Sequence, residues 1–416
     1  MMDIAGLYGK YVASDAALSK QAVSRIDNLI GKHREIFGTA AEAVFSTSGR
    51  TELGGNHTDH NLGKVIAGSI NLDTIAAVHR TSDNKVTFVS EGYPALCVDL
   101  ACLAVDEKLF GTTSALITGV AFAFSKRGGI IGGFCANVSS SVFKGSGLSS
   151  SAAIEVLLGT IFNNLYNSDR FSTTELAIMG QEAENIHFGK PSGLMDQIAC
   201  ANGGVVGIDF KDPSTPVITP IAVDFADYGY NLVITTTGGN HADLTADYAS
   251  IPQEMKAVAG LFGKSTLREV SEDAFFAEIG SLRGHLSNDR ALLRAYHYFE
   301  ENKRVDSMIK ALGCGDFSSY LSLVTESGSS SFRYLQNIYS PSAASEQGIA
   351  LAYAMTESFL NGDGAFRVQG GGFAGTLEAY VPIDRTTAYF SHMEKLFGTG
   401  CCTILAIRNL PTTRIS

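Results

Sequence analysis

Residues 144–153 read Lys-Gly-Ser-Gly-Leu-Ser-Ser-Ser-Ala-Ala, and the apolar residues that follow keep the spacing of a helix. Glycines let a backbone approach an anion closely. A helix N-terminus offers that anion unpaired N–H groups and the positive end of the helix dipole. We therefore predict a helix over residues 151–165 whose start cradles the phosphates of a nucleotide. A helix cap built from common small residues is the plainer alternative.

The composition describes a globular chain with two domains. Its 416 residues exceed what one hydrophobic core usually supports. Hydrophobic residues make up 45% and charged residues 18%, and the formal net charge is -11 at pH 7. This charge argues against a nucleic-acid partner, because binding to a phosphate backbone needs clustered Lys and Arg.

The cysteines and the apolar runs indicate the cellular location of the protein. The seven cysteines lack the spacing of a metal site, and their odd number fits reduced thiols better than a disulfide framework. The first residues do not combine a basic segment with an apolar one, so we expect no signal peptide. No apolar run reaches membrane-spanning length. We expect a cytoplasmic protein without membrane association.

The order of the expected elements favours an α+β fold. Helical spacing is found in residues 1–40, 151–165, 174–187, 252–335 and 345–359. Strand-like runs are 65–70, 75–79, 86–89, 96–98, 204–210, 231–235, 366–375 and 376–381. These elements mix without a repeating βαβ order, which argues against a doubly wound sheet. The prolines of residues 212–216 mark a connection, so we expect domains over 1–212 and 213–416.

Three further segments are unusually polar and rich in glycine. Gly49–Asn61 combines a guanidinium, imidazoles, carboxylates and amides, a mixture that suits a polyhydroxylated ligand. A loop that satisfies its own turns is the alternative, and we interpret the polar stretch from Phe45 to Asn61 as a functional loop rather than a core element. Residues 183–197 contain two carboxylates, and residues 364–373 contain three successive glycines, which suggest close backbone approach.

Two patterns in these segments are set aside. Gly370–Gly375 satisfies G-x-G-x-x-G but runs into an expected strand instead of a helix, so we expect no dinucleotide fold. His57 and His60 suggest a metal pair, yet no comparable cluster of His, Asp or Glu occurs elsewhere in the sequence. We therefore do not expect zinc hydrolysis.

Taken in this order, four segments resemble the galactokinase branch of the GHMP small-molecule kinases. Gly49–Asn61 is similar to the family's G-R-x-N-L-I-G-E-H-x-D-Y-N, and Phe143–Ala152 to its phosphate loop, P-x-G-x-G-L-S-S-S-A. Ala183–Gln197 is similar to A-E-N…G-I-M-D-Q, and Ala365–Gly375 to G-A-R-x-T-G-G-G-F-G-G. With weaker similarity elsewhere, the resemblance covers most of the chain.

The resemblance implies a two-domain GHMP kinase fold, with a ferredoxin-like second domain and an active site in the cleft between the domains. It implies that ATP is bound by Gly145, Ser146, Gly147, Leu148, Ser149, Ser150 and Ser151. Mg²⁺ would be held by Glu184 and one of the serines, for which we take Ser151, since this cation prefers oxygen ligands.

The resemblance also implies roles in catalysis and in sugar binding. Asp196 would receive or orient the proton of the sugar's anomeric hydroxyl. Arg50 would keep Asp196 ionised and neutralise charge on the transferred group. The expected sugar-binding residues are Asn56, His57, Asp59, Gly193 and Tyr248.

The chain departs from the family pattern at several positions. Asn56 replaces the family's Glu, Glu52 its Asn and His60 its Tyr, while Phe143 replaces the Pro that opens the phosphate loop and Ser192 a Cys. An amide at position 56 can still bond a hydroxyl, but it adds a donor and removes a charge. None of these changes removes an expected catalytic group.

The activity implied is ATP-dependent phosphorylation of D-galactose at its anomeric hydroxyl, giving α-D-galactose 1-phosphate. Because of Asn56, a kinase for a related sugar such as N-acetylgalactosamine or arabinose stays open. A sensor that binds galactose and ATP without catalysis is a third possibility, because a fold alone does not fix function. The expected partners are the small-molecule sugar and ATP, with no nucleic acid, no membrane and no obligate protein partner.

Overall fold

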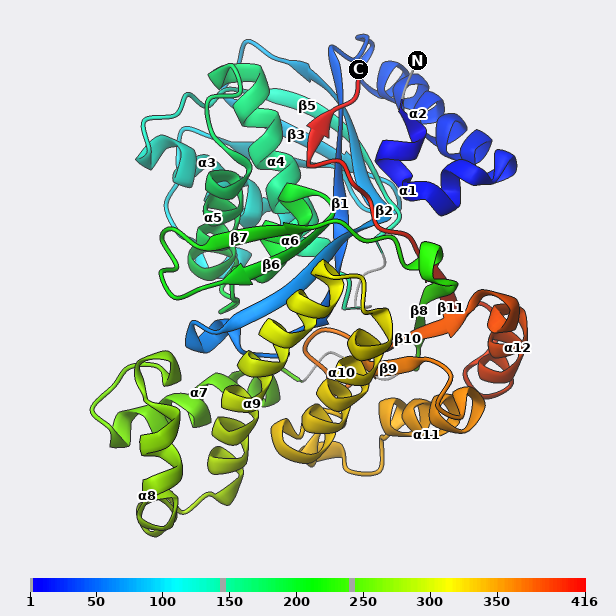
Figure 1. The fold of residues 1–416 in the computed structure, drawn as a ribbon. Coiled ribbons are helices and arrows are strands. Elements are labelled where there is room, and N and C mark those ends of the chain that lie inside the picture. The colour runs from blue at the N-terminus through cyan, green and yellow to red at the C-terminus, as the bar shows by residue number, and fades with distance from the viewer. Residues whose placement is uncertain (1–2, 143–146, 239–243) are drawn as a thin grey trace.

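The strands of the computed structural model form two sheets, the first in the upper part of Figure 1 and the second at its lower right. The structure describes residues 3–142, 147–238 and 244–416. The strands of the first sheet are β1 (Ala43–Gly54), β2 (Lys64–Arg80), β3 (Lys85–Ser90), β4 (Leu96–Asp99), β5 (Phe134–Ser140), β6 (Val205–Asp209), β7 (Val217–Ile221) and β12 (Thr413–Arg414). Within the described ranges their order is β12-β1-β2-β5-β3-β4, with β6 also paired to β2 and β7 to β6.

The second sheet is antiparallel and touches the end of β1. Its strands are β8 (Tyr230–Thr236), β9 (Ala365–Val368), β10 (Thr376–Pro382) and β11 (Cys402–Leu405). Their order in the described chain is β11-β8-β10-β9. Leu53 of β1 and Ile66 of β2 belong to the same buried cluster as Leu232, Ile234 and Tyr380 of the second sheet. The second half of β1 therefore connects the two sheets.

Helices cover both sheets. They are α1 (Ile4–Ser14), α2 (Ala16–Phe37), α3 (Thr113–Lys126), α4 (Ser150–Asn167), α5 (Thr173–Ala183), α6 (Met195–Asn202), α7 (Thr245–Leu261), α8 (Glu272–His285), α9 (Asp289–Gly313), α10 (Phe317–Ser330), α11 (Gly348–Leu360) and α12 (Thr386–Phe397). Helices α3 to α6 lie on one face of the first sheet and α1 and α2 on the other (Figure 1). Side chains alternate accordingly: Phe45 packs in the α3–α5 core, and its neighbour Val44 packs against α2.

The interpretation of the polar stretch from Phe45 to Asn61 as a loop is wrong as far as Gly54. β1 runs from Ala43 to Gly54 with every residue buried. Its polar side chains find partners inside the protein: Ser46 donates to Asp73 at 2.6 Å, and Thr47 pairs with Thr412 at 2.6 Å. Hydrogen bonds of this kind remove the cost of burying polar groups, so this strand needs no apolar alternation.

Several other expectations are confirmed with shifted bounds. The α+β class holds, and the helix expected over 151–165 is α4. The runs at 65–70 and 75–79 form the single strand β2, and α7 contains Pro252 in its interior instead of starting there. The domain division expected between residues 212 and 213 stays a prediction; this position lies in the turn between β6 and β7, which pair with each other in the first sheet.

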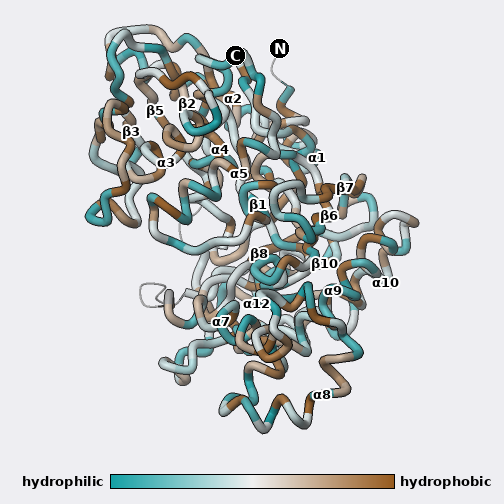
Figure 2. The backbone as a smooth tube through the Cα atoms, turned by 90° about the vertical axis from the view of Figure 1, so that its left-hand side faces the viewer, coloured by the Kyte–Doolittle hydropathy of each residue, from teal (hydrophilic) through white to brown (hydrophobic). Residues whose placement is uncertain are grey.

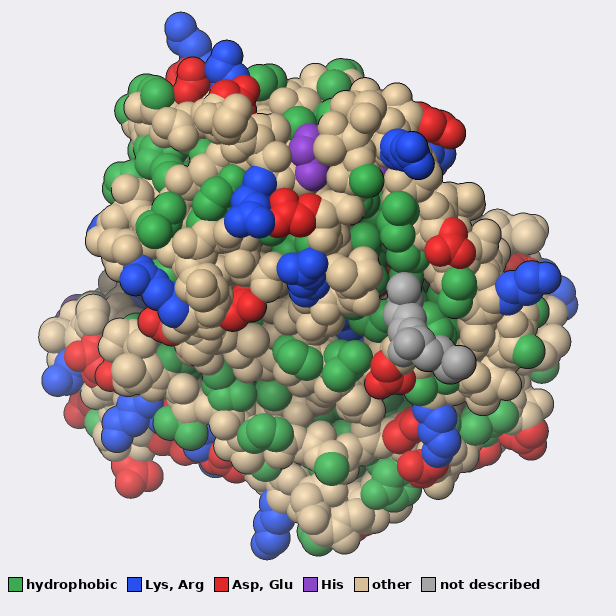
Figure 3. Space-filling model, turned by 90° about the horizontal axis from the view of Figure 1, so that it is seen from above, with side chains coloured by type: hydrophobic (Ala, Val, Ile, Leu, Met, Phe, Trp, Pro, Cys, Tyr) green, Lys and Arg blue, Asp and Glu red, His purple; other side chains and the backbone are tan. Residues whose placement is uncertain are grey.

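The surface carries charges of both signs. Figure 3 shows Lys and Arg side chains beside Asp and Glu on the face seen from above. Ion pairs of the described residues include those of Glu182 with Lys126 and Arg127, each at 2.6 Å. Hydrophobic segments run through both halves of the molecule (Figure 2). Among the helices of the described residues, none has the length and apolar character needed to cross a membrane.

Candidate active site

Arg50 joins the middle of β1 to two distant segments. Its Nε donates to Oδ1 of Asp196 at 2.8 Å, and its Nη1 donates to the carbonyl oxygen of Gly147. Its backbone N–H donates to the carbonyl oxygen of Leu148 at 3.2 Å. The Arg50 side chain is only 5% exposed. The structure thus brings together the arginine, the aspartate and the serine-rich segment that the sequence suggested.

The serine-rich segment starts α4 without a side-chain cap. Ser149 takes a left-handed conformation at the N-cap, and its hydroxyl donates to Oδ2 of Asp196 instead of accepting from the first turn of the helix. The N–H groups of that turn, which begins at Ser150, are therefore left for an anion. The Leu148 side chain is fully buried, so its contribution is limited to its backbone. The expected residues Gly145 and Ser146 lie outside the described residues.

The electrostatics of Asp196 favour the ionised carboxylate. Burial alone raises the pKa of this carboxyl, but the charge and hydrogen bond of Arg50 and the hydroxyl of Ser149 together hold the pKa below its ordinary value. The side chain keeps 25% of its surface exposed. Asp196 is therefore a charged acceptor that remains reachable beside the start of α4.

A hydroxyl and a carboxylate meet in the first turn of α4, at Ser151 and Glu184. Ser151 donates to Oε1 of Glu184 at 2.9 Å, and Gln197 donates to Oε2 of Glu184 at 3.0 Å. Among the described residues, no group of three or more His, Cys, Asp or Glu is arranged to hold a metal. One carboxylate and one hydroxyl nevertheless fit Mg²⁺, which commonly keeps waters and phosphate oxygens as its other ligands.

Sequence reasoning missed Lys190. Its Nζ lies 2.9 Å from Oε1 of Glu184, its side chain is 54% exposed, and its charge lowers the pKa of Asp196. It is the only lysine between Lys144 and Lys211, and it stands between the two segments that carry Glu184 and Asp196. A single basic residue between these two carboxylates was the signal by which the sequence could have identified Lys190. Its ammonium group can meet a phosphate oxygen beside Glu184.

Three successive glycine carbonyls hold three of the expected sugar-binding residues. Asn56 Nδ2 donates to Gly370 O at 2.8 Å, His57 Nε2 donates to Gly371 O at 2.9 Å, and the Tyr248 hydroxyl donates to Gly372 O at 3.0 Å. A Cβ on Gly371 would lie 2.3 Å from the Tyr248 ring. The glycines are thus needed for this close approach.

Burial makes His57 a neutral side chain. It lowers the pKa of His57 to about 3, and nearby His60 adds to the effect. Because Nε2 carries the proton donated to Gly371, Nδ1 is left as an acceptor. A neutral imidazole of this kind can accept a hydrogen bond from a sugar hydroxyl.

The amide of Asn56 is surrounded by protein. Its Nδ2 donates to Glu52 at 2.9 Å as well as to Gly370, and its Oδ1 accepts from Asn337 at 2.8 Å and from Ser331 at 3.2 Å. The residue is 0% exposed. All four hydrogen-bonding positions of the amide are taken, so direct bonding to a sugar, as the sequence suggested, has no free group in this conformation.

Asp59 and Gly193 lie against each other although 134 positions separate them in sequence. A Cβ on Gly193 would come within 1.7 Å of Oδ2 of Asp59. Oδ1 of Asp59 accepts from the backbone N–H of His60 at 2.9 Å. The absence of a side chain at Gly193 therefore decides where this carboxylate can be.

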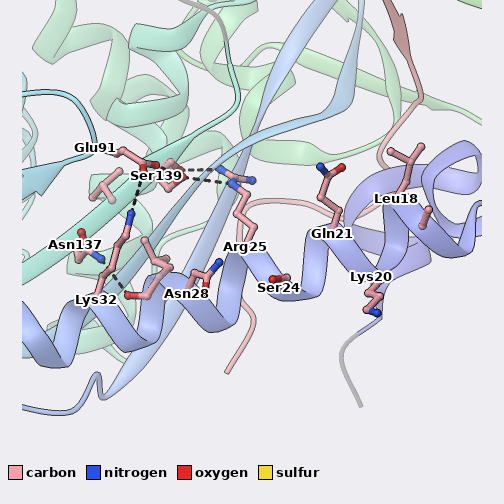
Figure 4. Close-up of a pocket in the computed structure, with 13 residues that line it drawn as sticks. Leu18, Lys20, Gln21, Ser24, Arg25, Asn28, Lys32, Glu91, Asn137 and Ser139 are labelled. Atoms are coloured by element: carbon pink, nitrogen blue, oxygen red, sulfur yellow. Dashed lines mark hydrogen bonds and ion pairs between the residues drawn. The ribbon is translucent and has the colours of Figure 1, made fainter.

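A pocket lies away from these residues, between α2 and β5. It has a volume of about 620 Å³ and is lined by Arg25, Lys32 and Glu91 among others (Figure 4). Three of its charged groups already have partners: Lys32 lies 3.0 Å from Glu91, and Arg25 donates to the carbonyl oxygen of Ser139 at 2.8 Å. We assign no ligand to it.

Comparisons with known proteins agree with this geometry. Residues 115–204 match the model of the GHMP kinases N terminal domain, and residues 31–80 match the galactokinase galactose-binding signature. The fold is similar to that of Lactococcus lactis galactokinase complexed with galactose, with a TM-score of 0.79 and 24% identity over 94% of this chain and 99% of that one. A mevalonate kinase is a more distant structural neighbour, with a TM-score of 0.61 and 16% identity over 88% of this chain and 99% of that one. The fold and the site thus define a GHMP kinase.

Curated relatives show which family of GHMP kinases the chain belongs to. The galactokinase of Ligilactobacillus salivarius is 30% identical over 374 residues, which is 88% of this chain and 92% of that protein. The galactokinase of Streptomyces coelicolor is 29% identical over 373 residues, 89% of this chain and 92% of that protein. The chain belongs to the galactokinase family, and the family expected from the sequence is confirmed.

Proposed function

We propose that this chain transfers the γ-phosphoryl group of ATP to the anomeric hydroxyl of D-galactose, giving α-D-galactose 1-phosphate and ADP. The observation that carries the proposal is the meeting of Arg50, Asp196 and Ser149 at the start of α4. Membership of the galactokinase family supports the choice of galactose and ATP as substrates.

The chemistry at Asp196 is that of a positioned base. Its carboxylate, kept ionised by Arg50, accepts the hydrogen bond of the anomeric hydroxyl and takes its proton as the new O–P bond forms. Arg50 then offsets the charge that develops between the sugar oxygen and the phosphoryl group. The remaining exposure of Asp196 is what allows a sugar to reach it.

The phosphates and the sugar approach from different elements. The N–H groups at the start of α4, from Ser149 to Ser151, would bind the triphosphate, with Lys190 as a second source of positive charge. Glu184 and Ser151 would hold Mg²⁺, which offsets phosphate charge when it is bound. On the other side, His57 and Asp59 supply an acceptor imidazole and a carboxylate for sugar hydroxyls.

A sugar panel tests the proposal. ADP release by the purified chain with ATP and Mg²⁺ is measured for D-galactose, N-acetylgalactosamine, L-arabinose and D-glucose. We expect the highest kcat/KM with galactose, since a site of buried donors and acceptors rejects sugars that leave them unpaired. A higher value for another sugar would replace galactose as the substrate. Galactose binding without ADP release from any sugar would favour the sensor.

A further inference from the structure

Glu52 is the buried carboxylate nearest to Arg50 along β1, and sequence reasoning gave it no role. It is 2% exposed. Its Oε1 accepts from Nη2 of Arg367 at 2.6 Å and from Nδ2 of Asn56 at 2.9 Å. A buried carboxylate costs free energy unless it is paired and hydrogen-bonded, and here both conditions are met.

Arg367 connects this carboxylate to the second sheet. It lies in β9 and is 0% exposed. Besides the carboxylate, its Nη1 binds the backbone carbonyl oxygen of Glu52 at 2.6 Å. The planar guanidinium therefore holds both the side chain and the main chain of one residue of β1. Two residues after Arg367, the chain enters the loop whose carbonyls bind Asn56, His57 and Tyr248.

Asn56 completes the connection from the other side. The same amide nitrogen that binds Glu52 also donates to Gly370, so a single group bonds both β1 and the glycine loop. His57, the next residue, is held to Gly371 in turn. The position of the His57 ring thus depends on a chain of contacts that starts at the Glu52 carboxylate.

We propose that Glu52 and Asn56 form a buried positioning pair that holds the sugar-binding segment on the Gly370–Gly372 loop and so sets the affinity for the sugar. The proposal rests on the proposed galactokinase activity. Both residues act through protein contacts: Glu52 acts through Arg367, and Asn56 acts through the carbonyl of Gly370. Loss of the pair shifts His57 and Tyr248 relative to each other.

The order of the two residues supports the pairing. The galactokinase pattern that Gly49–Asn61 resembles has Asn and Glu at these positions, and this chain has Glu52 and Asn56, the same two residue types exchanged. Because the two side chains touch, an exchange keeps one carboxylate and one amide in the same buried volume. The carboxylate for Arg367 is then kept in either order.

The test is an exchange cycle on the full chain with Glu52→Asn, Asn56→Glu and the double variant. E52N leaves Arg367 without its carboxylate, and N56E places a second carboxylate against the first and against the Gly370 carbonyl. We expect each single variant to raise the KM for galactose about tenfold or more, while the KM for ATP stays within about threefold. The double variant should return the galactose KM to within about threefold of the wild-type value.

The controls separate positioning from general stability. Asp73→Asn removes another fully buried carboxylate, one that contacts β1 at Ser46, and should lower the melting temperature with both KM values unchanged. A loss of folded enzyme changes the apparent kcat but not a KM. Where E52N does not fold, Glu52→Gln keeps the volume and the acceptor for Asn56 while removing the charge.

Two results would overturn the proposal: an unchanged galactose KM in E52N or E52Q, or a double variant as impaired as the worse single one. Absence of wild-type turnover with galactose would instead refute the proposed activity. In that case the melting temperatures of the wild type, E52N, N56E and the double variant still test whether Glu52 and Asn56 act as a pair. Recovery in the double variant would support it, and additive losses would refute it.

Discussion

Gly193→Ala tests whether the contact between Gly193 and Asp59 shapes the sugar site. The new Cβ would lie 1.7 Å from Oδ2 and 2.5 Å from Cγ of Asp59. An ordinary van der Waals contact needs at least about 3.4 Å, so the carboxylate must move by roughly 1.7 Å. The backbone at Gly193 is outside the left-handed region, so the effect is steric and not conformational.

A displacement of this size is large for Asp59 as a proposed sugar-binding group. Misplacement by about 1 Å can reduce a rate about 10²-fold, so we expect kcat/KM for galactose to fall about 10²-fold or more. The assay is ADP release over a range of galactose concentrations at saturating ATP. The KM for ATP should change little, because the start of α4 is not part of this contact.

Two matched variants give this prediction its controls. Gly31→Ala in α2 places a methyl group with nothing within 4 Å, and it should leave activity unchanged while stabilising the helix by up to about 1 kcal/mol. In an Asp59→Ala background the alanine at position 193 meets no carboxylate and should cost little further activity. Wild-type kcat/KM in G193A, or the same loss with and without Asp59, would refute the reasoning.

Three further predictions concern the other groups. Asp196→Ala should keep galactose binding, measured by calorimetry, while kcat falls about 10²- to 10⁴-fold; near-wild-type turnover would remove the proposed base. Glu184→Gln should raise the Mg²⁺ concentration for half-maximal activity about tenfold or more, and an unchanged Mg²⁺ titration would contradict its role. Burial raises the pKa of Glu378 from 4.5 to about 7. Between these pH values the folded state keeps the proton of this carboxyl and the unfolded state loses it. The free energy of unfolding should therefore fall as pH rises from 4.5 to 7. Glu378→Gln should flatten that decline in thermal unfolding, by up to about 1.4 kcal/mol per pH unit; parallel curves for the two proteins would show that Glu378 does not cause it.

The local parts of the site could be predicted from the sequence because they depend on neighbours along the chain. Glycines and serines before an apolar helical pattern predict the start of α4, and its observed first residue is Ser150. The sequence predicts a regular helix over 174–187, but the α-helix α5 ends one turn earlier, at Ala183. A wider π turn, Glu184–Phe188, follows it. That turn carries Glu184 at its first residue, beside Ser151.

The long-range contacts could not be predicted, since no spacing rule reports them. Arg367 lies 315 positions from Glu52, and only the fold, which brings Arg367 of β9 to Glu52 of β1, makes them partners. The same limit explains the error at β1. Its polar residues lack the alternation of a half-buried strand, because partners on both faces satisfy them, and those partners come from other parts of the chain.

A strand, not a loop, at residues 43–54 changes how the two substrates are related. Arg50 and Glu52 stand two residues apart in β1, so their separation is fixed by the strand and not by loop conformation. Arg50 faces the serine segment and Asp196, and Glu52 faces Arg367 and the glycine loop. The positions proposed for the phosphates and for the sugar are therefore fixed relative to each other by this one strand. Substitutions along β1, such as E52N, should therefore act on the substrates through this alignment.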